Sequence, residues 1–335
     1  MNDPSNESVL NTGIRLSMRV YFIKRMLALI PTIFLATLIV FFVIRLIPGD
    51  IIDQMIAQND AADQELTRAK LEHALGLDLP VHIQYFHWIK KIALEGDLGN
   101  SLWNDVPVIE EISDRLPVSI ELGLISIIVG LLVAIPVGVI SAIRQETLAD
   151  YIGRSISIAG LSIPNFWLGT LVIVLPSIWW SWSPPIEVIP FTEDPIENLK
   201  MFLLPGCITG LVFSAVIMRM TRAMMLEVLR QDYIRTAWAK GLKEKTIIIR
   251  HALKNALIPV ITIIGLQIPI LVAGLVIMEQ IFALPGMGTL ILESIYSRDY
   301  PIITGVMLLL GLFILMINVL VDLSYGFLDP KIRYD

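Results

Sequence analysis

The residue types that most often do chemistry are sparse in this chain, and their spacing does not bring them together. His82 and His87 are five residues apart, so on a helix they diverge and make a poor pair of metal ligands. Cys207 is the only cysteine, which excludes an internal disulfide and any Cys-x-x-Cys site. The sequence has no Gly-x-x-x-x-Gly-Lys-Ser/Thr and no His-Glu-x-x-His, and Gly286-Met287-Gly288 is not completed as Gly-x-Gly-x-x-Gly. We therefore expect no metal, no cofactor and no catalytic residue in this chain.

The elements that must position the remaining polar residues are strongly apolar. Of the 335 residues, 55% are hydrophobic, and the mean hydropathy of +0.73 is rarely reached by a soluble globular protein. Six runs of at least 18 residues lack a charged side chain and are long enough to cross a bilayer. They cover residues 26–44, 122–143, 155–186, 201–218, 255–278 and 300–321. We predict an all-α polytopic membrane protein with six transmembrane helices. The third run is longer than one crossing needs, and Pro164 and Pro176 suggest a broken helix there.

The distribution of basic residues predicts how the chain is oriented. An even number of spans puts both termini on one side, together with the loops 144–154 and 219–254. Those segments are rich in Lys and Arg, whereas the two short loops on the other side contain only Lys200 and Arg298 as basic residues. The excess of positive charge places the first set in the cytoplasm.

The chain then divides into five segments. They are a cytoplasmic N-terminal segment (1–25), a first transmembrane helix (26–47), an external segment (48–115), a transmembrane core (116–324) with a cytoplasmic loop at 220–255, and a cytoplasmic tail (325–335). In the external segment, residues 83–92 read as an amphipathic helix. Its aromatic side chains, Tyr85, Phe86 and Trp88, suit a membrane–water interface.

The basic stretch from Arg219 to Lys254 is the longest polar segment inside the transmembrane core, and it holds nine of the 25 Lys and Arg residues. Leu226, Leu229, Tyr233 and Ala237 recur at helical spacing and predict one helical face. Gly241 then marks a sharp turn at positive φ, and a second helix runs from Lys243 toward Pro259. These features alone fit a solvated loop that fixes topology as well as they fit a docking site.

This stretch resembles the EAA loop of permease subunits in binding-protein-dependent ATP-binding cassette importers. Arg235-Thr236-Ala237 stands in the place of Glu-Ala-Ala, and Gly241 follows at the family's spacing. His251 and Leu253 occupy the places of the family's Ile and Leu, and Lys254 replaces its Pro. These departures match the dipeptide, oligopeptide and nickel branch. The resemblance implies an ATPase-coupling role for eight residues: Asp232, Tyr233, Arg235, Thr236, Ala237, Lys240, Gly241 and Leu242.

Other parts of the chain resemble the same branch. These are Gly96 to Ser101, Arg115-Leu116-Pro117, Met278 to Gly288, Arg298 to Pro301 and the tail from Leu328 to Tyr334. Glu279 lies in the third of these stretches, at the outer end of the fifth span. It either lines the external mouth of a translocation path or is a helix-end carboxylate in solvent.

The resemblance implies a type I importer permease fold in the inner membrane of a prokaryote. The chain would be the first of two unlike permease subunits, non-catalytic, working with two cytoplasmic ATPases that bind ATP and Mg and with an external solute-binding protein. Peptides are the expected cargo, with nickel or another small solute as the alternative, and no nucleic acid is involved. A self-sufficient secondary transporter would need coupling groups and internal repeats, and a membrane-bound enzyme would need clustered polar residues at core depth; neither is evident.

Overall fold

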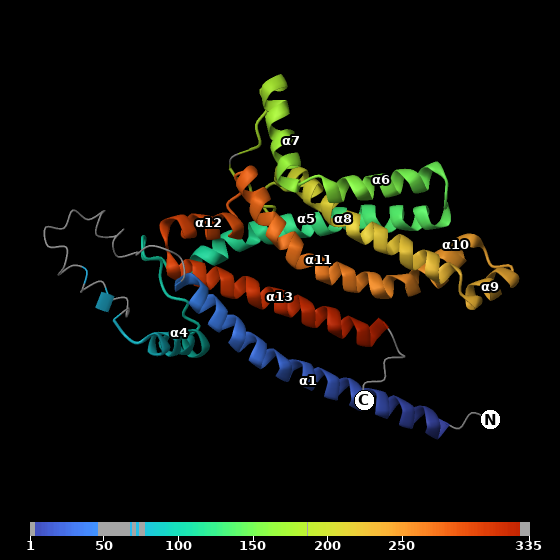
Figure 1. Ribbon diagram of the computed structural model, residues 1–335, viewed down its shortest axis with the longest axis horizontal. Helices are drawn as coiled ribbons and strands as arrows, with labels where there is room; N and C mark the ends of the chain where they lie inside the picture. Colours follow the sequence, from blue (N-terminus) through green and yellow to red (C-terminus); the bar gives the residue numbers. More distant parts are fainter. Residues whose placement is uncertain (1–3, 46–67, 69–71, 74–77, 186, 329–335) are drawn as a thin grey trace. The chain divides into compact units, whose positions relative to one another are not determined.

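The computed structural model describes residues 4–45, 68, 72–73, 78–185 and 187–328. In this part of the chain the regular elements are all helices (Figure 1). They are α1 (Pro4–Arg45), α4 (Val81–Glu95), α5 (Val108–Ile143), α6 (Leu148–Ser162), α7 (Asn165–Trp180), α8 (Pro195–Leu229), α9 (Asp232–Ala239), α10 (Glu244–Thr246), the π-helix η1 (Ile247–Leu253), α11 (Lys254–Ile281), α12 (Met287–Ser297) and α13 (Tyr300–Leu328). The predicted tail beyond residue 328 and much of the segment 48–77 lie outside the described residues.

Five of the described helical segments are long and apolar enough to cross a membrane. They are Arg25–Val43, Val108–Ile143, Pro195–Leu229, Glu244–Ile281 and Tyr300–Ser324. The pair Leu148–Ser162 and Asn165–Trp180 also passes when taken together, which gives the predicted total of six. The all-α membrane fold is thereby confirmed.

The third span is bent by 92° between α6 and α7, and α7 turns sharply away from α6 in Figure 1. The bend falls at Ile163 and Pro164 because a residue before proline is pushed into extended backbone, and Ile163 has φ −93° and ψ 119°. Pro164 therefore breaks the helix as predicted. Pro176 does not, since it lies inside the continuous helix α7.

The helices group into two compact units. Unit 1 contains Pro117–Thr289 with the N-terminal end of α1 and the C-terminal end of α13. Unit 2 contains Ile23–Leu116 and Leu290–Leu315. Each unit is held together by contacts of its own.

In unit 1, α5 and α8 approach closely enough for their backbones to touch. A Cβ added at Gly130 would lie 2.9 Å from the carbonyl oxygen of Gly210. A Cβ at Gly138 would lie 2.8 Å from that of Met218. Small residues at such spacing let membrane helices pack by van der Waals contact, which is the main attraction left where lipid replaces water.

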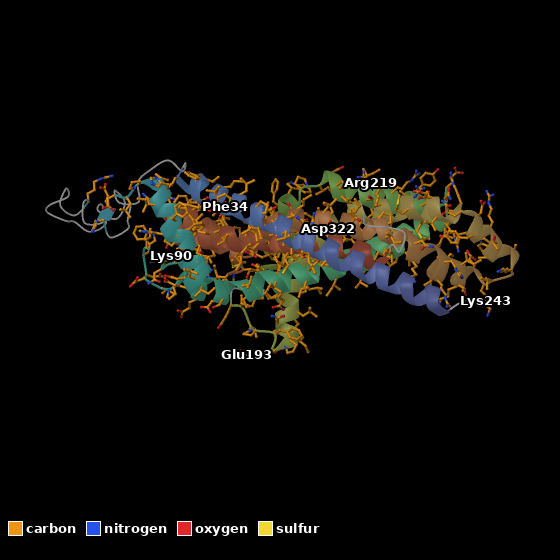
Figure 2. The ribbon with its side chains drawn as sticks, turned by 90° about the horizontal axis from the view of Figure 1, so that it is seen from below. Phe34, Lys90, Glu193, Arg219, Lys243 and Asp322 are labelled. Carbon is orange, nitrogen blue, oxygen red and sulfur yellow. The ribbon has the colours of Figure 1, made fainter. Side chains whose placement is uncertain are left out.

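In unit 2, α4 packs on α1 through aromatic side chains. The hydroxyl groups of Thr37 and Tyr85 are 2.9 Å apart, and the rings of Phe41 and Tyr85 meet edge to face at 5.2 Å. Phe86, the next residue along α4, is exposed. Figure 2 labels Phe34 on α1 and Lys90 on α4, the two helices of this packing. The amphipathic helix predicted over 83–92 is confirmed and extends from Val81 to Glu95.

Candidate functional site

The predicted docking segment is the short helix α9, which stands apart from the long helix before it. α8 ends at Leu229, and Gln231 is extended with φ −71° and ψ 147°. The prediction of one helical face running from Leu226 to Ala237 is therefore wrong. The chain changes direction at Arg230 and Gln231, and α9 begins again at Asp232. In Figure 1, α9 and α10 lie at the end of unit 1 where α8 ends and α11 begins.

The turn after α9 is closed as its glycine predicts. Gly241 has φ +70°. Its N–H donates to the carbonyl of Trp238 at 2.9 Å, and the N–H of Leu242 donates to that of Ala237 at 3.4 Å. This pair of bonds is the Schellman arrangement, which needs a left-handed residue at this position. The predicted backbone role of Gly241 is confirmed.

The inward face of α9 consists of Ile234 and Ala237, which are 0% and 7% exposed. They belong to a buried cluster, here called the corner cluster, made of Ala142, Met225, Ile234, Ala237, Ile247, Ala252 and Ala256. The cluster joins the end of α5, the end of α8, α9, η1 and the start of α11. Ala237 was expected to face a partner, and that expectation is wrong because its side chain packs inside the chain.

The other predicted side chains lie on the outward face of α9 or just after its end. Asp232, Tyr233, Arg235, Thr236, Lys240 and Leu242 are all exposed, as is Trp238. Arg235 and Asp232 are 3.4 Å apart but largely in solvent, so their pairing contributes little to stability. The face is thus polar and aromatic, and its side chains are available to another molecule.

Tyr233 also fixes how α9 is held. Its hydroxyl accepts a hydrogen bond from Asn255 Nδ2 at 2.8 Å and donates to the His251 carbonyl at 3.5 Å. Asn255 in turn donates to the same carbonyl at 3.0 Å. These bonds tie α9 to the junction of η1 and α11, so α9 follows the start of the fifth span.

The second helix of the loop differs from its prediction in two ways. It contains the seven-residue π-helix Ile247–Leu253, a form that is rare and often found at functional sites. It also runs through Pro259 as far as Ile281. Nothing in the local residue types signalled the π-helix. Its inward residues, Ile247 and Ala252, belong to the corner cluster, so the π-helix is packed against the same buried residues as α9.

Glu279 is 1% exposed and binds the first turn of α12. Its carboxylate accepts from Ser119 Oγ at 2.5 Å, from the Gly288 N–H at 2.7 Å and from the Thr289 N–H at 3.2 Å. The Met287 N–H donates to Ser119 Oγ at 2.7 Å. The alternative of a solvated helix-end carboxylate is therefore wrong. The carboxylate neutralises N–H groups that no helix carbonyl can accept, at the positive end of the helix dipole.

A second carboxylate, that of Asp299, holds a turn in unit 2. It accepts from Ser101 Oγ at 2.5 Å and from the Leu102 N–H at 3.2 Å. Trp103 Nε1 donates to the carbonyl of Ser297 at 2.9 Å. Burial raises the pKa of the Asp299 carboxyl above its usual range, against the hydrogen bond from Ser101 that lowers it. Two stretches that resemble the same branch, Gly96–Ser101 and Arg298–Pro301, thus meet here.

No group of three or more His, Cys, Asp or Glu side chains among the described residues is arranged to hold a metal ion.

The sequence analysis did not predict an ion pair that the structure shows between Asp150 and Arg222, at 2.8 Å. The signal that could have revealed this pair was the presence of opposite charges near the ends of two predicted spans.

Two family models match the chain. One describes the inner membrane component of binding-protein-dependent transport systems and covers residues 134–334. The other describes the N-terminal part of such membrane components and covers residues 18–123.

Individual relatives match almost end to end. The dipeptide transport system permease protein DppB of Escherichia coli (strain K12) is 37% identical over 337 residues, covering 94% of this chain and 98% of its own length. The protein of the same name from Alkalihalophilus pseudofirmus is 39% identical over 337 residues, covering 95% of this chain and 100% of its own length. A Brucella abortus (strain 2308) protein is 38% identical over 318 residues, with 95% and 100% coverage.

Proposed function

Because the chain belongs to the family of binding-protein-dependent transport system inner membrane components, we propose that it is one of two unlike permease subunits of an ATP-binding cassette importer. The second permease would complete the translocation path. Two cytoplasmic ATPases would bind and hydrolyse ATP, and an external solute-binding protein would deliver the cargo. This chain would be non-catalytic, with both termini in the cytoplasm.

The observation that carries the proposal is the way α9 is held. Its inner face is buried between the ends of two long apolar helices, and its outer face is free to bind a protein. A helix fixed in this way can pass a rigid movement from a cytoplasmic protein to the spans attached to it. The ATPase would contact the exposed residues Tyr233, Arg235, Thr236 and Trp238.

We propose peptides as the cargo. Two relatives that cover nearly the whole chain are dipeptide permeases by name. In this class of importer the binding protein selects much of the cargo, so the permease needs a path of suitable width more than a selective pocket.

The test is reconstitution in proteoliposomes. The complete complex should accumulate radiolabelled dialanine only with ATP, and this chain alone should accumulate none. Uptake by this chain alone, driven by an ion gradient, would instead identify a secondary transporter and overturn the proposal.

Thr236→Glu tests the docking face directly. Thr236 is exposed, so the variant should keep the stability of the chain while copurification of the ATPase subunits falls. The matched variant Ala237→Glu buries a carboxylate in the corner cluster, and it should lower the stability of the chain itself by several kcal/mol. Undiminished ATPase binding by Thr236→Glu would remove this face of α9 from the proposed interface.

A further inference from the structure

A buried ion pair lies in unit 1 beside the corner cluster. Asp150, in the first turn of α6, is 1% exposed. Arg222 of α8 donates two hydrogen bonds to the Asp150 carboxylate, from Nε to Oδ1 at 2.8 Å and from Nη2 to Oδ2 at 2.9 Å. This bidentate geometry fixes distance and angle together.

The surroundings satisfy both partners. Ser141 Oγ, near the end of α5, donates to Asp150 Oδ1 and accepts from Arg222 Nε at 3.2 Å. The Glu146 N–H donates to Asp150 Oδ2 at 3.2 Å. Arg154 Nε, one turn along α6, lies 3.8 Å from Asp150 Oδ1. One carboxylate thus connects three helices, α5, α6 and α8.

Such a pair contributes little net stability, because desolvation of the two charges offsets most of their attraction. Apolar residues of similar volume could fill the same space. The pair does fix how the three helix ends lie relative to one another. Apolar contacts would restrict this arrangement less, because they are not directional.

The position of the pair relates it to α9. Ser141 precedes Ala142, and Arg222 lies one helical turn before Met225. Ala142 and Met225 both belong to the corner cluster, which buries Ile234 and Ala237 of α9. The residues of the ion-pair network and the cluster residues that bury α9 therefore lie on the same stretches of α5 and α8.

We propose that Asp150 and Arg222 are positioning residues that couple α6, and through it the bent third span, to movement of α9. With the pair intact, the ends of α5, α6 and α8 move as one body when α9 is displaced. Without it, α8 and α9 move while α6 lags. The inference rests on the proposed function, because the displacement of α9 would come from the ATPase.

The main variant is Arg222→Lys, which keeps the positive charge but cannot make the bidentate pair of hydrogen bonds. The complete complex is reconstituted, and dialanine uptake is measured per ATP hydrolysed. This ratio should fall about fivefold, while the thermal stability of the complex and its copurification stay near those of the unaltered protein. Asp150→Asn should lower the ratio at least as much.

The matched control is Arg219→Lys, on an exposed arginine of the same helix (Figure 2). It should leave the ratio unchanged. A role limited to stability predicts that the ratio tracks thermal stability in all three variants. If Arg222→Lys transports with the unaltered ratio, the proposal is wrong.

A second measurement separates this inference from the proposed function. Spin labels at Leu148 and Thr236, both exposed, in a Cys207→Ser background report the distance between α6 and α9 without any partner. Arg222→Lys should broaden that distance distribution, and an unchanged distribution would overturn the inference. Failure of the complete unaltered complex to transport would instead overturn the proposed function.

Discussion

At the scale of single residues, two glycines adopt the same left-handed backbone conformation, each after the end of a helix. Gly241 follows α9 with φ +70°, and Gly96 follows α4 with φ +66°. A Cβ added at either position would have no atom within 4 Å apart from those of the glycine and its two chain neighbours. Substitution therefore costs only the left-handed backbone penalty, about 1–2 kcal/mol for a residue with a side chain.

This equivalence makes a matched experiment. Gly241→Val should reorient the end of α9, so copurification of the ATPase subunits should fall while membrane insertion persists. Gly96→Val carries the same penalty at α4 and should leave ATPase binding intact. Equal loss of binding in both variants would mean that general destabilisation, rather than the geometry of α9, is responsible.

Asp299 is the residue whose ionisation should be visible in the stability of the protein. Its pKa is raised by burial, so the folded protein keeps this proton to a higher pH than the unfolded chain does. Between the ordinary carboxyl pKa of about 3.9 and the raised value, the native state binds more protons. The free energy of unfolding must then fall as pH rises through this window.

The measurement is thermal unfolding of the purified protein across acidic to neutral pH. Asp299→Asn should flatten the decline in stability over that window, because the titrating group is gone. Asp114→Asn removes an exposed carboxylate of α5 and should leave the decline in place. A decline that is as steep in Asp299→Asn as in the unaltered protein would contradict the assignment.

At the scale of elements, the sequence predicted those features whose cause is local. The αL turn at Gly241 and the bend at Pro164 follow from the backbone of one residue each. The break between α8 and α9 does not, since Arg230 and Gln231 contain no helix breaker. That break, the π-helix and the burial of Ala237 all depend on the corner cluster, whose members are spread from Ala142 to Ala256.

The burial of the ionisable residue Glu279 could likewise not be predicted from its neighbours in the sequence. Its place at the end of an apolar run left open the mouth of a translocation path or solvent, but neither reading revealed its partner Ser119, 160 residues away in the sequence. Gly286 and Gly288 leave the space that its carboxylate occupies, since a Cβ on Gly288 would lie 2.8 Å from Glu279 Oε2. We therefore expect any effect of Glu279 on transport to act through its contacts with Ser119 of α5 and with the first turn of α12.

Glu279→Gln should loosen the first turn of α12. The amide oxygen can still accept a hydrogen bond, but the NH₂ group faces N–H donors, and an unmade buried bond costs about 1–3 kcal/mol. We expect lower uptake by the reconstituted complex with the ATPase subunits still bound. Glu293→Gln, on an exposed residue of the same helix, should transport normally. Unchanged uptake by Glu279→Gln would show that the carboxylate's contact with α12 is not needed for transport.

At the scale of the whole molecule, the exposed surface is too apolar for water. Leu124, Ile128 and Leu132 lie along one exposed stripe of α5, and Trp179 and Trp180 are exposed at the end of α7. Such a surface requires lipid or another apolar protein surface as cover. The charged residues concentrate instead at the helix ends and loops, which is the arrangement from which the orientation in the membrane was predicted.

That orientation can be measured with an impermeant thiol reagent in intact cells. Single cysteines replace Glu95, at the end of α4, or Gln231, before α9, in a Cys207→Ser background; both positions are exposed. If the Lys and Arg excess is cytoplasmic, Cys at 95 reacts in intact cells and Cys at 231 reacts only after the membrane is permeabilised. Labelling after permeabilisation is the control that both thiols are accessible. Reaction at 231 but not at 95 in intact cells would place α9 outside, where no cytoplasmic ATPase could reach it, and the proposed coupling would be excluded.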